Sequence, residues 1–262
     1  MRVRVRFAKF GSARFLGHLD VMRYFQKVFR RAELPLMFSE GYHPHPILSF
    51  AQPLSLSYTS DGEYFDMELR EELSEETIAA CLTKACNPEI PANRVTILPD
   101  HKPNAKKVTG MSLITGASYA ISLRQMPQNL PEVLHKFASE KSYMVEKTTK
   151  NGTRECDLRA GVHGLSILKN GVITRLYDDG SYLFSDEDML RGAEHASLYD
   201  DTAVIVWLDA GSERNIPADV FLQGILSYAG ITEEKPERTS FHRMDLFGDK
   251  DEKKVPLWMI ES

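Results

Sequence analysis

Residues 2–35, RVRVRFAKFGSARFLGHLDVMRYFQKVFRRAELP, place a strand pattern directly before a helix pattern. Charged and apolar residues alternate over 2–7, which is the two-residue period of a β-strand. Over 18–33 the apolar residues recur at steps of three and four, which is the period of a helix with one buried face. Pro35 then ends this helix, because proline cannot continue it. A strand joined to an amphipathic helix in this way indicates a domain that combines a sheet with helices.

The rest of the first hundred residues continues this alternation. We expect, in order, a strand at 47–56, a turn at 60–62 (SDG), a strand at 64–70, a helix at 74–86 capped by Ser74, and a strand at 94–100. With the first strand and helix, the order is β-α-β-β-α-β, which is the ferredoxin-like arrangement. In that arrangement both helices cover one face of an antiparallel sheet. The sequence therefore predicts an N-terminal ferredoxin-like domain at 1–100.

The remaining residues predict a second domain of the same kind. Residues 101–118 are polar and rich in turn formers, which indicates a linker. Beyond it we expect strands at 119–126, 143–150, 153–162, 202–210 and 238–248, an Asn-Gly turn at 151–152, and helices at 130–140 and 217–230. The predicted fold is therefore α+β, with two tandem ferredoxin-like units, the second at 119–248 carrying an insertion near 155–200. A charged tail follows at 249–262, and its run DKDEKK indicates a mobile segment.

The composition is that of a globular protein. Of 262 residues, 42% are hydrophobic and 26% are charged, which excludes a disordered or fibrous chain. No apolar run approaches the roughly 18 residues of a membrane span, and the first ten residues lack the apolar core of a signal peptide. We therefore expect a cytoplasmic protein without membrane contact. The three cysteines form no CxxC pair, so we expect them to be packed thiols.

Basic residues are concentrated at the N-terminus. The net charge is −5, yet residues 1–31 hold nine basic residues against one acid. One face of the first strand carries Arg2, Arg4 and Arg6. One sector of the helix carries Arg23, Lys27, Arg30 and Arg31. Either these are ordinary solvated faces, or they form a surface that binds the phosphates of RNA or another polyanion.

A second candidate region is FSEGYHPHPILSF, residues 38–50. Its two prolines, Pro44 and Pro46, bias the preceding histidines toward extended backbone. On one interpretation the prolines only shape the approach to the next strand. On the other, Tyr42 and His45 contact a nucleic acid by stacking and hydrogen bonding.

A metal site at these histidines would need further ligands. The available candidates are His18, Asp20 and Glu40, but no ligand set with a recognised spacing is present. We therefore predict neither a metal nor a cofactor. His18 and Asp20 are two residues apart at the start of a helix, so their side chains point in different directions and do not form a dyad. Asp20 is favourable there because it faces the positive end of the helix dipole.

Motifs of the common nucleotide-binding and hydrolytic enzymes are missing. The sequence has no Walker loop, no GxGxxG after a strand, no GxSxG and no HExxH. It also lacks the CxxxCxxC run that holds a radical-initiating iron–sulfur cluster. These absences give no direct indication of an enzyme.

Residues 15–69 resemble the radical-SAM-linked protein family, a bacterial domain of unknown function found alone or fused to B12-binding radical-SAM proteins. The resemblance lies in HLD at 18–20, RRAELP at 30–35, Ser39-Glu40-Gly41 followed by PHP at 44–46, SFAQPL at 49–54, and DGEYFD at 61–66. TRECDLR at 153–159 and the turn at 211–217 extend it over 1–247. His43 stands where the family often has Asn, so His45 is the better member of the motif. The resemblance implies a radical-SAM enzyme as partner and a role in RNA metabolism.

Our leading hypothesis is a non-catalytic accessory protein of a radical-SAM enzyme. It would bind RNA or another polyanion through the basic residues above, Tyr42 and His45. The alternative is a metal-independent endoribonuclease with His18 or His45 as general base, since the tandem ferredoxin-like layout is similar to the CRISPR repeat-processing endoribonucleases. A third hypothesis is a scaffold that binds only proteins.

Overall fold

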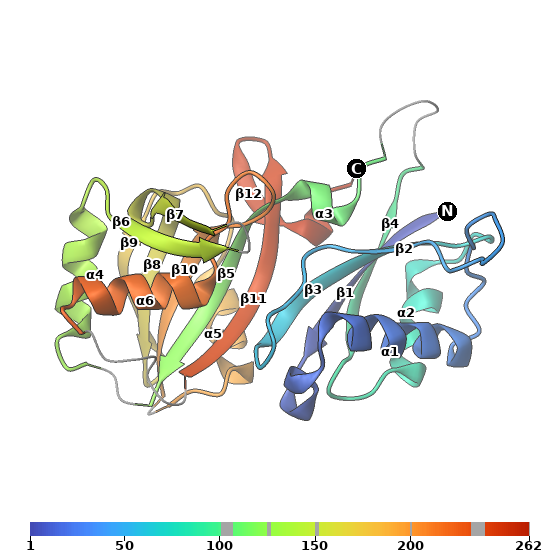
Figure 1. Ribbon diagram of the computed structural model, residues 1–262. Helices are drawn as coiled ribbons and strands as arrows, with labels where there is room; N and C mark the ends of the chain where they lie inside the picture. The colour runs from blue at the N-terminus through green and yellow to red at the C-terminus, as the bar shows by residue number, and fades with distance from the viewer. Residues whose placement is uncertain (101–106, 125–126, 150–151, 200, 232–238, 262) are drawn as a thin grey trace. The chain divides into compact units, whose positions relative to one another are not determined.

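The computed structural model describes residues 1–100, 107–124, 127–149, 152–199, 201–231 and 239–261 (Figure 1). Its helices are α1 (His18–Arg31), α2 (Glu75–Ala85), α3 (Gly110–Leu113), α4 (Leu130–Ser139), α5 (Asp186–His195) and α6 (Ala218–Tyr228), with 3-10 turns η1 (Gly11–Phe15), η2 (Arg159–Gly161) and η3 (Leu257–Met259). Its strands are β1 (Arg2–Lys9), β2 (Leu48–Phe50), β3 (Thr59–Glu68), β4 (Ala92–Leu98), β5 (Ile114–Leu123), β6 (Met144–Thr149), β7 (Gly152–Asp157), β8 (Val162–Lys169), β9 (Val172–Asp178), β10 (Thr202–Asp209), β11 (Thr239–Lys250) and β12 (Lys253–Pro256). The predicted α+β class is confirmed.

The chain forms two compact units. Unit 1 consists of Met1–Ile114, Asp245–Lys250 and Val255–Ser262. Unit 2 consists of Thr115–Met244 and Asp251–Lys254. Strand β11 and the hairpin after it therefore contribute residues to both units. Each unit is described by itself below.

Unit 1 contains the elements β1-α1-β2-β3-α2-β4 in chain order. In its sheet β4 pairs with β1, β1 pairs antiparallel with β3, and β2 pairs with β3. Strand β11 also pairs with β3, which gives the order β4-β1-β3-β11. Residues of α1 and α2 share one hydrophobic core with alternate residues of β1, so both helices cover the same face.

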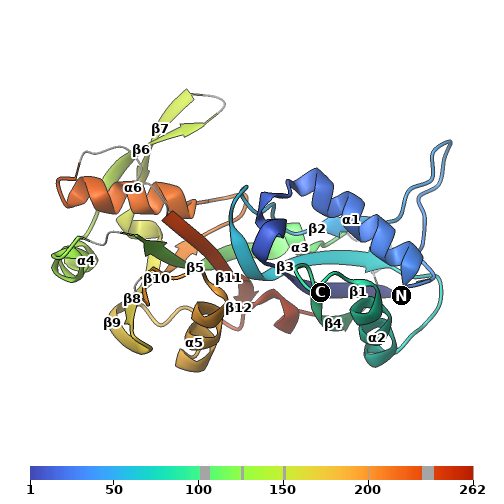
Figure 2. The ribbon, with the colours of Figure 1, turned by 90° about the horizontal axis from the view of Figure 1, so that it is seen from below.

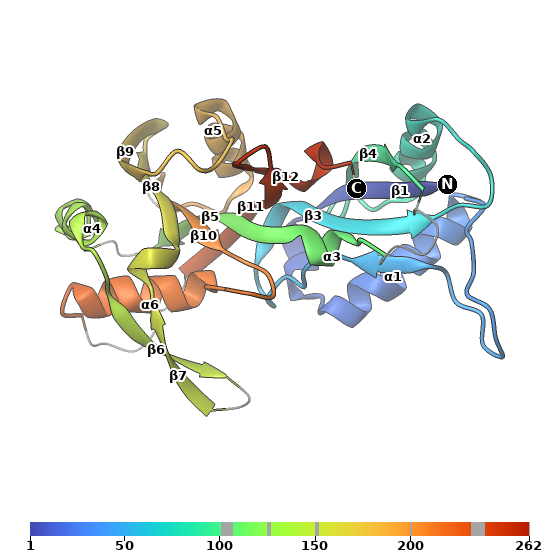
Figure 3. The same ribbon diagram turned by 90° about the horizontal axis from the view of Figure 1, so that it is seen from above.

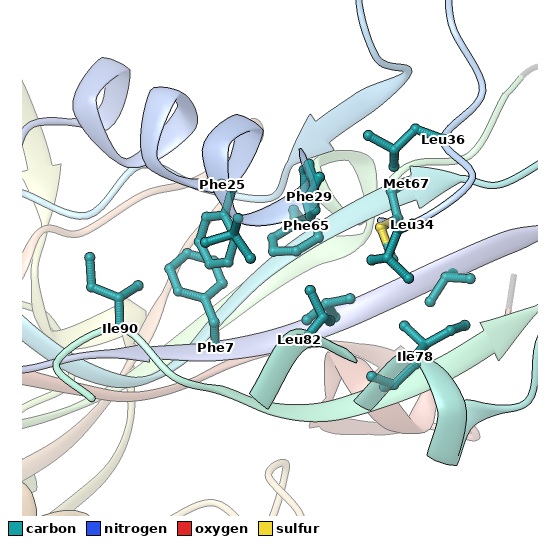
Figure 4. Packing of buried hydrophobic residues seen from close by; sticks show 14 of the residues in the cluster. Phe7, Phe25, Phe29, Leu34, Leu36, Phe65, Met67, Ile78, Leu82 and Ile90 are labelled. Atoms are coloured by element: carbon teal, nitrogen blue, oxygen red, sulfur yellow. The ribbon is translucent and has the colours of Figure 1, made fainter. Parts of the chain in front are cut away.

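Aromatic side chains fill the core of unit 1 (Figure 4). Phe7 of β1 points toward α1, and its ring centroid lies 4.8 Å from that of Phe25. Phe25 in turn lies 4.7 Å from Phe65 of β3. Ile78 and Leu82 of α2 are fully buried in the same cluster. The alternation of apolar residues in the first strand thus determines which face the helices cover.

The helix ends agree with local chemistry. Helix α1 ends two residues before the predicted limit, because Glu33 adopts a left-handed conformation with φ of 52°. Ser74 is the N-cap of α2, as predicted, and its hydroxyl accepts a hydrogen bond from the Thr77 amide at 3.2 Å.

The predicted turn at 60–62 is wrong, because these residues lie inside strand β3. A Cβ at Gly62 would stand 2.7 Å from the Cα of Asp245 in β11. Glycine is therefore required here for the close approach of two strands, and not for a turn. The predicted strand at 47–56 is also shorter than expected, since only 48–50 pair with β3.

Unit 2 has the strand order β11-β5-β10-β8-β9, and β6 and β7 form a separate two-stranded hairpin. Helices α4 and α6 pack together on one face, where the rings of Phe137 and Phe221 are 6.4 Å apart. Figures 2 and 3 show α5 on the opposite face of the strands. The predicted insertion near 155–200 contains β8, β9 and α5, and the strand predicted at 153–162 is divided by η2.

The predicted mobile tail forms regular structure. Asp251 and Glu252 turn the chain with φ of 49° and 63°, and β12 then pairs with β11. Leu257 of η3 is completely buried, because the last residues cover the face of the unit 1 sheet that the helices leave open. Residues 101–106 of the predicted linker lie outside the described residues, as do 125–126, 150–151, 200 and 232–238 at the limits of predicted elements. Within the described part, no helix is long and apolar enough to cross a membrane.

Candidate functional site

Residues 38–46 form a hairpin, which we call the arm. Phe38 bridges to Pro46, and the Ser39 amide donates a hydrogen bond to the His45 carbonyl at 2.8 Å. Figures 2 and 3 show the arm, in blue between α1 and β2, extending away from the sheet of unit 1. Tyr42 at its tip is 100% exposed. A fully exposed tyrosine gives this arm a free aromatic face.

The two histidines of the arm have different surroundings. The imidazole Nδ1 of His45 lies 2.9 Å from the hydroxyl of Ser39, which also accepts the His45 amide at 3.1 Å. His45 therefore helps to close the hairpin. The ring of His43 lies 6.3 Å from that of Tyr42 and is exposed.

The basic sector of α1 lies on the surface. Arg23, Lys27 and Arg30 are exposed. Arg23 is within 3.5 Å of Asp20, so Asp20 pairs with the helix's own arginine and not with a histidine. Arg31 is exposed as well, and it donates to the Ala85 carbonyl at the end of α2.

The arginine row of β1 does not face solvent, which corrects the sequence-based placement. Arg4 is 1% exposed. Its guanidinium forms two hydrogen bonds to Asp66, at 2.8 and 3.1 Å, and two more to the carbonyls of Leu257 and Ile260. Arg2 is also buried and donates to two backbone carbonyls. The alternation did place the arginines on one face, but the C-terminal residues cover that face at Arg4, and residues 99 and 108 engage Arg2.

Arg6 belongs to a buried cluster with Tyr64 and Asp245. The Asp245 carboxylate accepts hydrogen bonds from the Tyr64 hydroxyl at 2.5 Å and from the Arg6 guanidinium at 3.0 Å. Burial raises the pKa of Tyr64 well above its usual value, and the Asp245 charge raises it further. Burial alone would lower the pKa of Arg6, but Asp245 more than reverses this. The cluster is therefore an ion pair with a neutral phenol, closed to phosphate ligands.

A concave feature of unit 1, which we call the motif cleft, is lined by residues from the sequence segments 18–20, 49–54 and 61–66. The ring of His18 packs edge-on against Phe50 at 5.4 Å. Lys9 and Glu63, only 2% and 4% exposed, lie in the same wall. The Lys9 ammonium donates to the Leu16 carbonyl at 3.2 Å. Sequence reasoning missed Lys9 and Glu63, although Glu63 stands within the DGEY motif.

His18 and His45 do not meet. His18 is the first residue of α1, and the arm follows beyond the last turn (Figure 1). A helix of 14 residues is about 20 Å long. His18 of HLD and Glu63 of DGEY therefore line the motif cleft, whereas residues 39–41 and 44–46 belong to the arm.

Unit 2 contains a histidine that the sequence did not indicate. The Nδ1 of His163 lies 2.7 Å from Asp179, and its Nε2 lies 2.7 Å from Asp209. We call this group the His163 clamp. Burial alone would lower the pKa of His163, but the two carboxylates raise it above its usual value. Both ring nitrogens are engaged, so His163 is held as a cation rather than presented as a free base.

The clamp depends on an irregularity in the sheet. The pairing of β10 with β8 shifts register, so that Trp207 faces Gly164 and Leu208 faces Val162. His163 is the extra residue and leaves the ladder, as in a β-bulge. Its partners are 16 and 46 residues away in the sequence, which is why no local pattern identified them. Among the described residues no three His, Cys, Asp or Glu side chains gather as a metal site.

A family model described as "Uncharacterized protein conserved in bacteria (DUF2344)" matches residues 2–189. The chain belongs to this family. The DUF2344 match includes the whole arm and the motif cleft, as well as His163 and Asp179 of the clamp.

Comparison of this DUF2344 chain with curated proteins finds no match. Among solved structures it is similar to a chain of "Crystal Structure of a Cbf5-Nop10-Gar1 Complex", with a TM-score of 0.43 and 10% identity. The alignment covers 97% of this chain and 52% of that one, so this chain spans about half the length of the structure it matches.

Proposed function

We propose that the chain is a non-catalytic accessory protein that binds single-stranded RNA on unit 1. The observation that carries the proposal is Tyr42, which is fully exposed at the tip of the arm. Aromatic rings held away from a folded body are suitable for stacking on unpaired bases. Arg30, exposed in the last turn of α1, supplies a charge for the phosphates, together with Arg23 and Lys27 on the same helix.

The charges of this surface favour a small number of phosphate contacts. Arg23, Lys27 and Arg30 are exposed, whereas Glu33 after α1 and Glu40 within the arm add exposed acids. Arg2, Arg4 and Arg6 are excluded from the interface because their guanidinium groups are engaged inside unit 1. Three phosphate contacts give a slope of about −2 for the logarithm of affinity against the logarithm of salt concentration.

The test uses charge-neutral variants and single-stranded RNA. The triple variant Arg23→Gln, Lys27→Gln, Arg30→Gln should weaken binding and reduce the salt slope toward zero. The matched control, Lys84→Gln, Lys141→Gln, Lys169→Gln, removes the same charge from exposed lysines elsewhere and should bind normally. Equal binding by the two triple variants would refute the α1 surface as the RNA site.

A radical-SAM enzyme is the partner that we propose, supported by the resemblance of residues 15–69. The RNA-presenting role requires that nuclease treatment or high salt weaken co-purification of that enzyme with this chain. Co-purification that survives both treatments would support the protein-binding scaffold instead.

We further infer that both units are ferredoxin-like. The order β4-β1-β3 with β2 on β3 supports this for unit 1. For unit 2, the order β11-β5-β10-β8 supports the same arrangement, with β6, β7, β9 and α5 as additions.

The endoribonuclease remains a second candidate because of the motif cleft. His18 lines it beside a buried lysine and a buried glutamate, the side-chain types of general acid–base catalysis. Metal-independent cleavage of RNA that is lost in His18→Ala but retained in His45→Ala would establish this candidate. Intact RNA after prolonged incubation would eliminate it.

A further inference from the structure

Unit 2 contains a cavity at one end of its sheet, beside the first turn of α4, which we call the α4 cavity. Its volume is about 510 Å³. This volume lies within the range of roughly 300–1,000 Å³ that is typical of small-molecule sites. The lining residues used below are Arg124, Leu130, Ile167, Lys169, Tyr199 and Val204. They come from the residue after β5, from α4, from β8, and from β10 with the segment before it.

The floor of the cavity is aliphatic. Val204 of β10 pairs with Ile167 of β8, so the two side chains lie on the same face of the sheet. Val204 is 3% exposed, and Ile167 is half-buried. Leu130, the first residue of α4, is also buried and lines the same cavity. A saturated carbon chain placed on this floor would be removed from water on its lower side.

One wall of the cavity is held in place by Ser122 of β5. The Ser122 hydroxyl donates to the Thr202 carbonyl at 2.6 Å and accepts a hydrogen bond from the Tyr199 amide at 2.7 Å. Ser122 itself is buried. Because Tyr199 and Thr202 both line the cavity, this wall is ordered before any ligand binds, which lowers the entropic cost of binding.

Both charged side chains that line the cavity are cations. Arg124 and Lys169 are exposed, whereas the floor is not, so they lie toward the opening. Neither side chain forms a salt bridge or a hydrogen bond with the part of the chain that the structure describes. Two exposed acids, Glu132 and Asp201, adjoin lining residues in the sequence but do not line the cavity. The cavity therefore combines an apolar floor with unpaired positive charge at its opening.

We propose that the α4 cavity binds a small amphipathic anion, an aliphatic chain that carries a phosphate or a carboxylate head. The chain would cover the floor, and the head would pair with Arg124 and Lys169. Base stacking is not favoured here, because Tyr199 is the one aromatic side chain among the described lining residues. The proposal goes beyond the RNA contacts of unit 1. No residue of α1 or of the arm lines this cavity, so the two proposals can fail separately.

The test measures the affinity of the full chain for alkyl phosphates of increasing length by isothermal titration calorimetry. Butyl, hexyl and octyl phosphate should bind progressively more tightly, by about fourfold for each added methylene, which corresponds to about 0.8 kcal/mol per buried methylene. Octyltrimethylammonium has the same tail with the opposite charge and should bind about tenfold more weakly than octyl phosphate. Octanoate provides the carboxylate head, and the tighter of octanoate and octyl phosphate identifies the head that the cavity selects.

A pair of double variants provides the matched control. Arg124→Gln with Lys169→Gln removes both cations of the cavity and should weaken binding of octyl phosphate about tenfold, while the unfolding midpoint stays unchanged because both side chains are exposed. Lys141→Gln with Arg154→Gln removes the same charge from exposed positions elsewhere in unit 2 and should bind as the wild type does.

Four results would overturn the proposal. The first is that octyl phosphate does not bind at all. The second is an affinity that is independent of chain length, which would indicate an anion bound only at the surface. The third is equal binding of octyltrimethylammonium and octyl phosphate, and the fourth is equal affinity of the two double variants for octyl phosphate.

Discussion

Arg4 lies in a closed environment in which each of its contacts comes from another part of unit 1. Its charge is balanced by Asp66, while two carbonyls of the C-terminal segment accept hydrogen bonds from its Nη1. Asp66→Ala should therefore lower the free energy of unfolding by about 3–5 kcal/mol, because it leaves a buried guanidinium without a counter-ion. Urea denaturation measures the change.

The paired apolar variant provides the control for this prediction. Arg4→Met combined with Asp66→Leu removes both charges and should recover most of the loss, since the packing volume is kept. A double variant no more stable than Asp66→Ala would show that the ion pair contributes net stability of its own.

His163 gives unit 2 a stability that depends on pH. The pKa of His163 is raised in the folded state, so its contribution is fully present below the unfolded value of about 6.5 and is lost as the pH rises through the folded pKa. Hydrogen bonds from Ser181 and the contact with His163 lower the pKa of Asp179 despite its burial, so this carboxylate stays charged in the same window. The stability difference between wild type and His163→Gln should be larger at pH 6 than at pH 9. A difference that is independent of pH would contradict a charged clamp.

Sequence patterns located single side chains on the correct face but not their neighbours. The alternation in β1 placed Arg2, Arg4 and Arg6 together, and the same pattern cannot reveal the distant residues that engage each of them, such as Leu257 and Ile260 at Arg4. Asp20 was expected to favour the helix N-terminus, and its contact with Arg23 lies within one helical turn. The His163 clamp joins residues from three separate strands and loops, so it depends on tertiary pairing that no local period encodes.

At the scale of elements, the arm is separable from the sheet that supports it. Its described contacts are internal from Phe38 to Pro46, apart from Arg70, whose guanidinium lies 5.6 Å from the Phe38 ring. Replacing residues 40–44 by Asn-Gly should keep the hairpin closed, because that dipeptide favours the tight turn of a two-residue loop. We expect an unchanged unfolding midpoint and at least a tenfold loss of RNA affinity from the missing Tyr42, measured by fluorescence anisotropy. Unchanged affinity would remove the arm from the proposed interface.

Elements with a strong period were predicted well, and irregular ones were not. Helices α1, α4 and α6 follow their apolar spacing to within two residues at each end. The turn predicted at 60–62 was wrong because Gly62 serves a different purpose. It lets strand β3 approach β11 closely, although Ser-Asp-Gly are also typical residues of a turn. The prediction of a mobile tail was wrong because the charged run is confined to residues 249–254. Leu257 and Ile260, which follow this run, are buried.

At the scale of the whole molecule, unit 1 includes residues that follow unit 2 in the sequence. Residues 255–262 bury Val255, Leu257 and Ile260 and supply the carbonyls that Arg4 requires. Deleting them removes the burial of three apolar side chains, a loss of about 5 kcal/mol, which approaches the whole stability of a typical domain. The truncated chain should therefore lose hydrogen-exchange protection at the amides of β1 and β3. Removal of residues 261–262 alone is the control and should preserve protection, because Glu261 is exposed. Protected β1 amides in the chain ending at 254 would show instead that the N-terminal residues fold without the C-terminal segment.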